Sequence, residues 1–232
     1  MRKRHLMKME LLLPNPSNES LLVQRYEKKL PLEKWQLSEF FQSLQAANVF
    51  PKLVFPNRTV NSIYLDDEDL THYQDNVHGL SLRSKTRFRW YDSDLSKISL
   101  EYKKKTNHFS NKTVYVLKNP DNILPDTYLA AKKLIGLAPE LSNHLLVRPK
   151  MHVRYERAYY TLAPEIRMTV DTEMCFRKLD PLVSKSFNPS PVFSVIEFKY
   201  PADQSDTFNN LIRGMPFKLF RHSKYIIGLE SL

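Results

Sequence analysis

Six segments of the chain alternate charged and apolar residues, as a β-strand with one ionic face and one apolar face does. Side chains point to opposite sides along a strand, so residues two apart share a face. The clearest case is residues 80–91, where one face carries Arg83, Lys85, Arg87 and Arg89 and the other carries Leu82, Thr86, Phe88 and Trp90. The same alternation occurs in residues 21–30, 98–105, 151–161, 166–174 and 192–200. A chain built from such segments folds around a β-sheet.

The order of the predicted elements places this sheet in the α+β class. Segments rich in β-branched and aromatic residues predict strands, and apolar residues at helical spacing predict helices. Long crossover helices are not regularly interposed between the strands, which favours a mostly antiparallel sheet. The expected strands are residues 21–30, 60–65, 80–91, 98–105, 113–117, 151–161, 166–176 and 192–200, and the expected helices are residues 32–48, 68–77, 126–137, 204–213 and 218–229.

The charged faces allow two arrangements of this sheet. In an open sheet packed on one side, the ionic face is in contact with water. In a closed antiparallel barrel of about eight strands, the ionic face lines a lumen wide enough for a small ligand, and the helices cover the apolar outside. The ionic positions are rich in arginine and interleave acids with bases, and like charges this close repel unless an anion or an acid lies between them. Periodicity alone leaves both arrangements open.

Composition narrows the ligands that such a face can hold. Lys and Arg number 35 against 25 Asp and Glu, so the net charge is +10, which indicates a polyanionic partner or a solvated basic surface. The four glycines are far apart in the sequence, which excludes a glycine-rich dinucleotide fingerprint or a phosphate-binding P-loop. Phosphates would therefore be held by side chains. The single cysteine, Cys175, excludes an internal disulfide and a cysteine-based zinc site.

The chain is expected to form one domain over residues 20–232, preceded by a flexible arm of residues 1–19. The basic start of the arm resembles that of a signal peptide, but Lys8, Glu10 and Pro14 interrupt the apolar stretch that should follow. No run approaches the roughly 20 apolar residues that a membrane-spanning helix needs. We therefore expect no transmembrane segment and a cytoplasmic location.

Eight short motifs together resemble a known family. In chain order they are Arg25-Tyr-Glu-Lys-Lys29, Ser62-Ile-Tyr-Leu-Asp66, Arg83-Ser-Lys-Thr-Arg-Phe-Arg-Trp-Tyr91, Leu100-Glu-Tyr-Lys103, Tyr155-Glu-Arg157, Arg167-Met-Thr-Val-Asp171, Ile196-Glu-Phe-Lys199 and Ser223-Lys-Tyr225. They resemble the VTC (vacuolar transporter chaperone) domain, the polyphosphate polymerase branch of the CYTH-like triphosphate tunnel metalloenzymes. The resemblance extends over residues 21–229, nearly the whole chain.

The resemblance implies a closed tunnel with its basic residues inside and its helices outside. It also implies transfer of the terminal phosphate of ATP to a growing polyphosphate chain, assisted by a divalent ion, Mn²⁺ or Mg²⁺. The residues implied in catalysis are Arg87, Arg89, Lys103, Arg157, Arg167 and Lys224. Those implied in substrate binding are Lys29, Lys85, Tyr155, Lys199, Arg221 and Ser223, and Glu197 is implied as the metal-binding residue.

Hydrolytic members of the superfamily typically begin with Glu-x-Glu-x-Lys, whereas this chain has Arg25 at the first acidic position. The loss of one metal-binding acid favours the polymerase branch over the alternative of a tunnel triphosphatase. A non-catalytic module that binds polyphosphate or nucleic acid is the third hypothesis. Trp90 lies on the face opposite Arg87 and Arg89, which argues against base stacking beside these arginines and hence against a specific nucleic-acid partner.

Four further features have more than one interpretation. Glu27 could bind metal or pair with a neighbouring arginine, and pairing is favoured. Asp171 and Glu173 could orient Arg167 or assist with metal, and orientation is favoured. His222 could be a surface residue or could approach the tunnel mouth, because it adjoins Ser223 and Lys224 in the sequence. The acidic run of residues 66–69 is explained by a helix start, where negative charge is favourable.

Overall fold

The computed structural model describes residues 25–107, 109–118, 123–138, 141, 147–182 and 185–232. The predicted arm of residues 1–19 lies outside the described residues. The chain divides into two compact units. We call residues 63–149 the middle unit, and residues 25–62 with residues 150–232 the terminal unit. The single domain expected over residues 20–232 stays a prediction.

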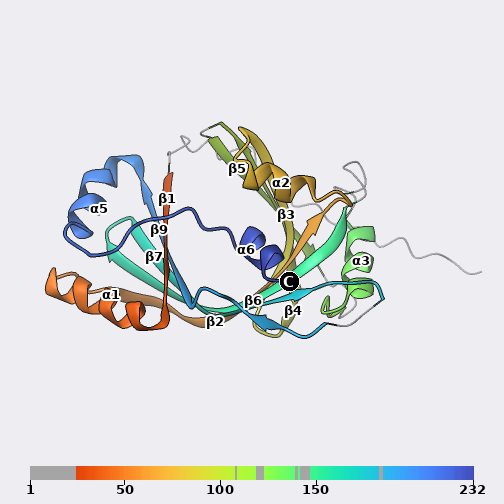
Figure 1. The fold of residues 1–232 in the computed structure, drawn as a ribbon, viewed down its shortest axis with the longest axis horizontal. Helices are drawn as coiled ribbons and strands as arrows, with labels where there is room; N and C mark the ends of the chain where they lie inside the picture. The colour runs from red at the N-terminus through yellow and green to blue at the C-terminus, as the bar shows by residue number, and fades with distance from the viewer. Residues whose placement is uncertain (1–24, 108, 119–122, 139–140, 142–146, 183–184) are drawn as a thin grey trace, which may run out of the picture. The chain divides into compact units, whose positions relative to one another are not determined.

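The terminal unit contains a sheet in the order β1-β9-β7-β6-β2, with β8 paired to β7 (Figure 1). Neighbours in the β1-β9-β7-β6 part of this order are antiparallel. The strands are β1 (Arg25–Leu32), β6 (Arg148–Ala163), β7 (Ile166–Lys178), β8 (Asn188–Pro189) and β9 (Ser194–Pro201), with the first part of β2 (Lys52–Asp66). The helices are α1 (Lys34–Ala46), the short 3₁₀ helix η1 (Ala202–Gln204), α5 (Ser205–Leu211) and α6 (Lys224–Glu230).

Helices α1 and α5 cover the apolar face of this sheet, as the alternation predicts. The apolar side of α1 contributes the buried residues Phe40 and Leu44, and the ring of Phe40 lies 6.2 Å from that of Phe198 on β9. Phe208 of α5 lies 5.2 Å from the same Phe198 ring. A capping box at Glu33 and Gln36 begins α1. Because the helices bury the apolar side, the ionic side of β1, β9 and β7 faces away from this core.

The middle unit contains the sheet order β2-β3-β4-β5 (Figure 1). It is built from the last part of β2, α2 (Thr71–Val77), β3 (Leu82–Tyr91), β4 (Asp94–Thr106), β5 (Phe109–Lys118) and α3 (Tyr128–Gly136). Strands β3, β4 and β5 are antiparallel. Phe88, Trp90, Ile98 and Leu100 are buried, as expected for the apolar faces of β3 and β4. The acidic run is a helix start, because the Asp66 carboxylate accepts the N–H groups of His72 and Tyr73 in α2.

The α+β class and the antiparallel sheet are therefore confirmed. Closure of the sheet into a barrel is not among the pairings of the described strands, since the pairing order ends at β1 and at β5. The segment 218–223 was expected to be helical, but α6 begins only at Lys224. In the part of the chain that the structure describes, no helix is long and apolar enough to cross a membrane.

The predicted alternation along β7 is wrong after Asp171 because the strand contains a bulge. Asp171 faces Arg157, but Cys175 faces Arg154, so β7 has one more residue than β6 over this stretch. The extra residue is Glu173, whose φ of 49° is in the left-handed region. The bulge moves Met174 and Phe176 to the face of Arg157, where an apolar patch forms.

Helix α6 packs on this apolar patch of the ionic face and differs in this respect from α1 and α5. A side chain at Gly228 of α6 would meet Met151 and Phe176, with the Phe176 Cδ1 atom only 2.7 Å from the added carbon. The absence of a side chain at Gly228 lets α6 approach the strands closely. The helix thereby places its first residue, Lys224, beside the ionic part of β6 and β7.

Candidate functional site

The ionic residues of the terminal unit form rows across β1, β9 and β7. Lys29 faces Glu197 and Glu27 faces Lys199 across the β1–β9 ladder. Lys199 also faces Arg167 on β7. Directly opposed residues of adjacent strands lie on the same face, so Lys29 with Glu197 and Glu27 with Lys199 each pair a base with an acid, whereas Lys199 and Arg167 are both basic. The sequence predicted the shared face, and the register adds which residues are neighbours.

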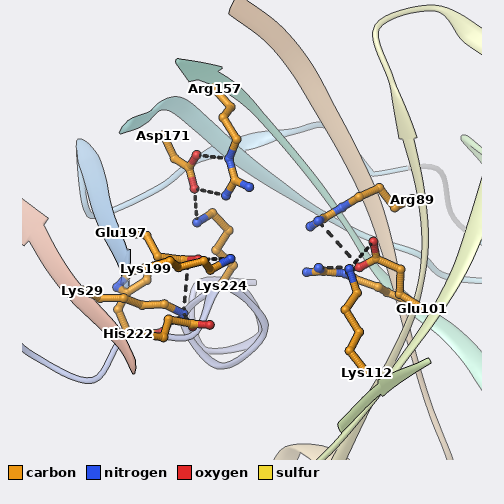
Figure 2. A network of polar contacts seen from close by, with 12 residues as sticks. Lys29, Arg89, Glu101, Lys112, Arg157, Asp171, Glu197, Lys199, His222 and Lys224 are labelled. Atoms are coloured by element: carbon orange, nitrogen blue, oxygen red, sulfur yellow. Dashed lines mark hydrogen bonds and ion pairs between the residues drawn. The ribbon is translucent and has the colours of Figure 1, made fainter. Parts of the chain in front are cut away.

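Asp171 is the centre of a buried triad with Arg157 and Lys224 (Figure 2). Its carboxylate is fully buried and accepts two hydrogen bonds from Arg157, at 2.6 Å from Nε and 2.8 Å from Nη2. Lys224 Nζ donates a third at 2.6 Å. Burial alone would raise the pKa of Asp171, but Lys224 and Arg157 outweigh it and lower the pKa. Asp171 is therefore ionised and fixes both cations.

The aromatic ring of Tyr155 contacts the two cations of this triad. The Arg157 guanidinium lies 5.2 Å and the Lys224 ammonium 4.7 Å from the centre of its ring. Both are within the range of a cation–π contact. Burial would lower the pKa of Arg157, but Tyr155, Asp171 and Glu197 together hold it well above its ordinary value. The guanidinium therefore stays charged although it is largely buried.

A second carboxylate, Glu197, lies between Lys29 and Lys199 (Figure 2). Its oxygens are 2.6 Å from Lys199 Nζ and 3.6 Å from Lys29 Nζ. Burial would raise the pKa of Glu197, but Lys29, Lys199 and Arg157 lower it well below its ordinary value. Lys29 also pairs with Glu27 at 3.0 Å. The favoured pairing role of Glu27 is thus observed, with a lysine in place of the expected arginine.

The segment that precedes α6 is tied to β1. Phe220 N–H donates to the Lys29 carbonyl at 2.9 Å, and Lys29 Nζ donates to the His222 carbonyl at 3.1 Å. Ser223 caps α6 by accepting the N–H of Ile226 at 3.4 Å. These contacts hold the residues around Lys224 in place. Ser223 acts here as a helix cap, whereas the resemblance implies that it donates to substrate.

The middle unit has its own ionic cluster, centred on Glu101 of β4. Arg87 donates from Nε to this carboxylate at 2.7 Å, Lys112 of β5 donates at 2.9 Å, and Arg89 lies 3.6 Å away. Arg87 also donates to the hydroxyl of Tyr64 at 3.0 Å. Burial would raise the pKa of Glu101, but Arg87, Arg89 and Lys112 lower it to about 2. Glu101 is therefore an ionised anchor for three cations (Figure 2).

A row of three lysines lies next to this cluster. Lys85 of β3 faces Lys103 of β4, and Lys103 faces Lys112 of β5. Directly opposed like charges destabilise a sheet unless a negative charge lies near them. The carboxylate of Glu101, which pairs with Lys112, supplies part of this negative charge. The row gives this part of the strand face a local excess of positive charge.

The predicted site residues thus fall into two sets, one in each unit. The middle unit contains Lys85, Arg87, Arg89 and Lys103, and the terminal unit contains Lys29, Tyr155, Arg157, Arg167, Glu197, Lys199, Arg221, Ser223 and Lys224. Arg167 and Arg221 are exposed and form no ion pair among the described residues. Asp171 orients a cation as expected, but it binds Arg157 and Lys224, so its predicted pairing with Arg167 is wrong.

Sequence reasoning missed Lys112 as a member of the site. The predicted strand began at residue 113, whereas β5 begins at Phe109 and places Lys112 opposite Lys103. A strand extended by one residue at its start would have revealed a basic residue on the ionic face. Lys112 also pairs with Glu101 from the adjacent strand, a contact that the shorter predicted strand could not show.

Glu197 and the hydroxyl of Thr169 are the oxygen donors that would hold a divalent cation in this row. Mg²⁺-type ions are typically held by one or two carboxylates together with substrate phosphates and water. Thr169 faces Glu197 across β7 and β9, and its buried Oγ1 has no hydrogen-bond partner among the described residues. The described residues include no group of three or more His, Cys, Asp or Glu side chains that could hold a metal.

A comparison with protein-family models matches residues 24–232 to the VTC domain. The chain belongs to the VTC domain family. The match covers nearly the whole chain, so the resemblance inferred from the eight motifs is confirmed. A comparison with curated protein sequences gave no match.

Solved structures resemble this VTC domain in fold at low sequence identity. The PH1819 protein of Pyrococcus horikoshii is 14% identical, with a TM-score of 0.51 over 90% of this chain and 99% of its own. A putative adenylyl cyclase from Hippeastrum, described as having a dominant triphosphatase activity, is 11% identical, with a TM-score of 0.52 over 89% of this chain and 95% of its own. A putative adenylate cyclase from Bacillus halodurans is 11% identical, with a TM-score of 0.51 over 86% and 95%. These likenesses show that the chain shares its overall fold with these three proteins.

Proposed function

We propose that this VTC domain is a cytoplasmic polyphosphate polymerase that transfers the γ-phosphoryl group of ATP to a growing polyphosphate chain in a basic tunnel. The observation that carries the proposal is that three buried carboxylates, Asp171, Glu197 and Glu101, each hold at least two basic side chains. Asp171 holds Arg157 and Lys224, and Glu197 holds Lys29 and Lys199. Glu101 holds Arg87, Arg89 and Lys112. Cations fixed in this way suit an extended phosphate chain.

Phosphoryl transfer needs alignment and charge neutralisation more than covalent chemistry from the protein. Guanidinium and ammonium groups held on strands provide a field that does not need to reorganise when charge spreads over the transferred phosphoryl. In the proposal, Arg157 and Lys224 of the terminal unit neutralise this charge, and Lys29 and Lys199 of the same unit bind the flanking phosphates. Arg87 of the middle unit is a further proposed phosphate ligand. A divalent ion held by Glu197 would supply Lewis-acid stabilisation of phosphate oxygens.

The end of the polyphosphate chain is the proposed nucleophile, so no protein nucleophile is required. The basic residue Arg25 at the first acidic position of hydrolytic relatives supports polymerisation over hydrolysis. Hydrolysis is the second candidate, and the fold shared with the Hippeastrum protein is the observation that favours it. Both reactions use the same cationic face and differ in whether a phosphate chain or water attacks.

An assay of products separates these possibilities. Purified protein is incubated with ATP and Mn²⁺, and the products are resolved by polyacrylamide electrophoresis with staining for polyphosphate. A ladder of polymers is the expected result. Release of orthophosphate alone would support the triphosphatase, and unchanged ATP despite tight binding would support a binding module; either result would contradict polymerisation.

The Glu197→Gln variant tests the metal-binding role within the same assay. We expect it to lose turnover by about 100-fold or more while it still binds tripolyphosphate, because the neighbouring lysines remain. The matched control is Glu68→Gln, since Glu68 is 72% exposed and pairs only with Arg148 in the described contacts. Wild-type turnover in Glu197→Gln would remove this residue from the mechanism.

A further inference from the structure

His222 is a buried residue of the terminal unit with an unused hydrogen-bonding atom. The residue is 8% exposed, and its Nε2 atom has no hydrogen-bond partner among the described residues. Buried polar atoms are nearly always paired in folded proteins, and an unpaired one costs free energy. Such an atom in a proposed phosphate site indicates a group that pairs with it when the ligand binds.

The surroundings of His222 are those of the candidate site. Its carbonyl accepts a hydrogen bond from Lys29 Nζ, and Lys224 follows two residues later (Figure 2). The charged groups that act on the imidazole are Lys224, Lys29, Asp171 and Glu197. The ring therefore lies near both acids of the site. Asp171 holds Arg157 and Lys224, and Glu197 holds Lys29 and Lys199.

The imidazole of His222 is neutral in this environment. Burial disfavours the imidazolium, and the neighbouring ammonium groups of Lys224 and Lys29 disfavour it further, which lowers the pKa of His222 to about 3. A neutral imidazole carries one N–H, which can be placed on Nε2. The residue thus offers an uncharged donor among charged ones.

The other buried histidine of the terminal unit shows the contrast. His152 Nε2 lies 3.1 Å from Asn61 Oδ1, and its Nδ1 lies 3.2 Å from the Arg177 guanidinium. Both ring nitrogens of His152 are therefore paired within the protein, as expected of a histidine with a purely structural role. His222 differs because one of its nitrogens is buried and unpaired.

We propose that His222 Nε2–H donates a hydrogen bond to a non-bridging phosphate oxygen of the bound polyphosphate or of the ATP triphosphate. The inference rests on the proposed function and adds a substrate-binding residue to it. A phosphate oxygen is an acceptor that the site must accommodate in any case, and it would satisfy the buried donor. The bond adds specificity for a correctly placed oxygen without adding charge.

Calorimetric titration with tripolyphosphate at several salt concentrations tests the proposal. His222→Phe keeps a buried ring and removes the donor, and we expect roughly tenfold weaker binding. His222→Gln keeps an N–H donor and should bind within about threefold of wild type. Because the donor is uncharged, both variants should keep the wild-type dependence of affinity on salt, whereas Lys224→Gln should weaken that dependence.

The ring nitrogens provide a readout that a structural role would not change. In histidine-labelled protein, the ¹⁵N signals of His222 should shift when tripolyphosphate is added, and those of His152 should not. If wild-type protein does not bind tripolyphosphate, this inference and the proposed function both fail. If wild type binds but His222→Phe binds equally well, or the His222 signals stay unchanged, only this inference is overturned.

Discussion

Replacing Glu101 by glutamine should lower the free energy of unfolding of the middle unit, and the pKa shift of Glu101 gives the size of the loss. The side chain is 7% exposed and holds Arg87, Arg89 and Lys112. Burial raises the pKa of this carboxyl, but the cations lower it from 4.5 to about 2. At about 1.4 kcal/mol per pH unit, this difference corresponds to roughly 3 kcal/mol of unfolding free energy. The Glu101→Gln variant should lose about that much unfolding free energy at pH 7.

The pH dependence of the loss distinguishes this cause from a packing defect. Because the pKa of Glu101 is lower in the folded chain, its contribution is fully present above pH 4.5 and is lost as the pH falls toward 2. Urea unfolding can be followed by the fluorescence of Trp90, which is buried in the same unit. A Trp35→Phe background removes the exposed second tryptophan. The difference between wild type and Glu101→Gln should shrink steadily below pH 4.5.

The control is another ion pair of the same unit that lies at the surface. Glu68 Oε1 and Arg148 Nη1 are 2.9 Å apart, but the side chains of the two residues are 72% and 43% exposed. Glu68→Gln should therefore cost less than about 1 kcal/mol, because exposed pairs are screened by solvent. An unfolding midpoint of Glu101→Gln equal to that of wild type at pH 7, or a loss that is the same at pH 7 and pH 3, would refute the electrostatic explanation.

Two further predictions concern α6 and the triad beside it. Gly228→Ala should destabilise the terminal unit by about 1–3 kcal/mol in urea unfolding, because the new methyl group would overlap Met151. The control is Gly136→Ala in α3, where the new methyl group meets nothing within 4 Å. This substitution should be neutral or should stabilise the chain by up to about 1 kcal/mol. Equal effects of the two substitutions would contradict the close packing of α6. Asp171→Asn should cost about 3–5 kcal/mol, because it leaves Arg157 and Lys224 without their buried counter-charge; an unchanged melting temperature would contradict this.

The faces of β3 and β4 could be predicted from the sequence because these strands alternate regularly through their ionic stretch. Phe88 and Leu100 are buried as expected, and Arg87 and Glu101 share the opposite face. The same reasoning failed on β7, where Glu173 forms a bulge. Nothing in the local sequence marks that position, since a glutamate rarely adopts positive φ.

The partners of the site residues were less predictable than their faces. Arg157 and Asp171 lie 14 residues apart on adjacent strands, and their contact depends on a register that the sequence does not specify. Lys224 reaches Asp171 from a helix 53 residues away, which requires α6 to pack on the ionic side. The family motifs identified the basic residues, and the structure identified the acids that position them.

The acids on these ionic faces bear on whether the site binds or transfers phosphate. A carboxylate that holds two cations reduces their attraction for an anion, so a module that only retains polyphosphate would bind more tightly without Asp171, Glu197 and Glu101. The same carboxylates restrict long, flexible Arg and Lys side chains before substrate arrives, so less conformational entropy is lost on binding. Fixed geometry contributes most where charge must be matched in a transition state and where product must leave again. The buried acids therefore support the proposed turnover rather than storage of polyphosphate.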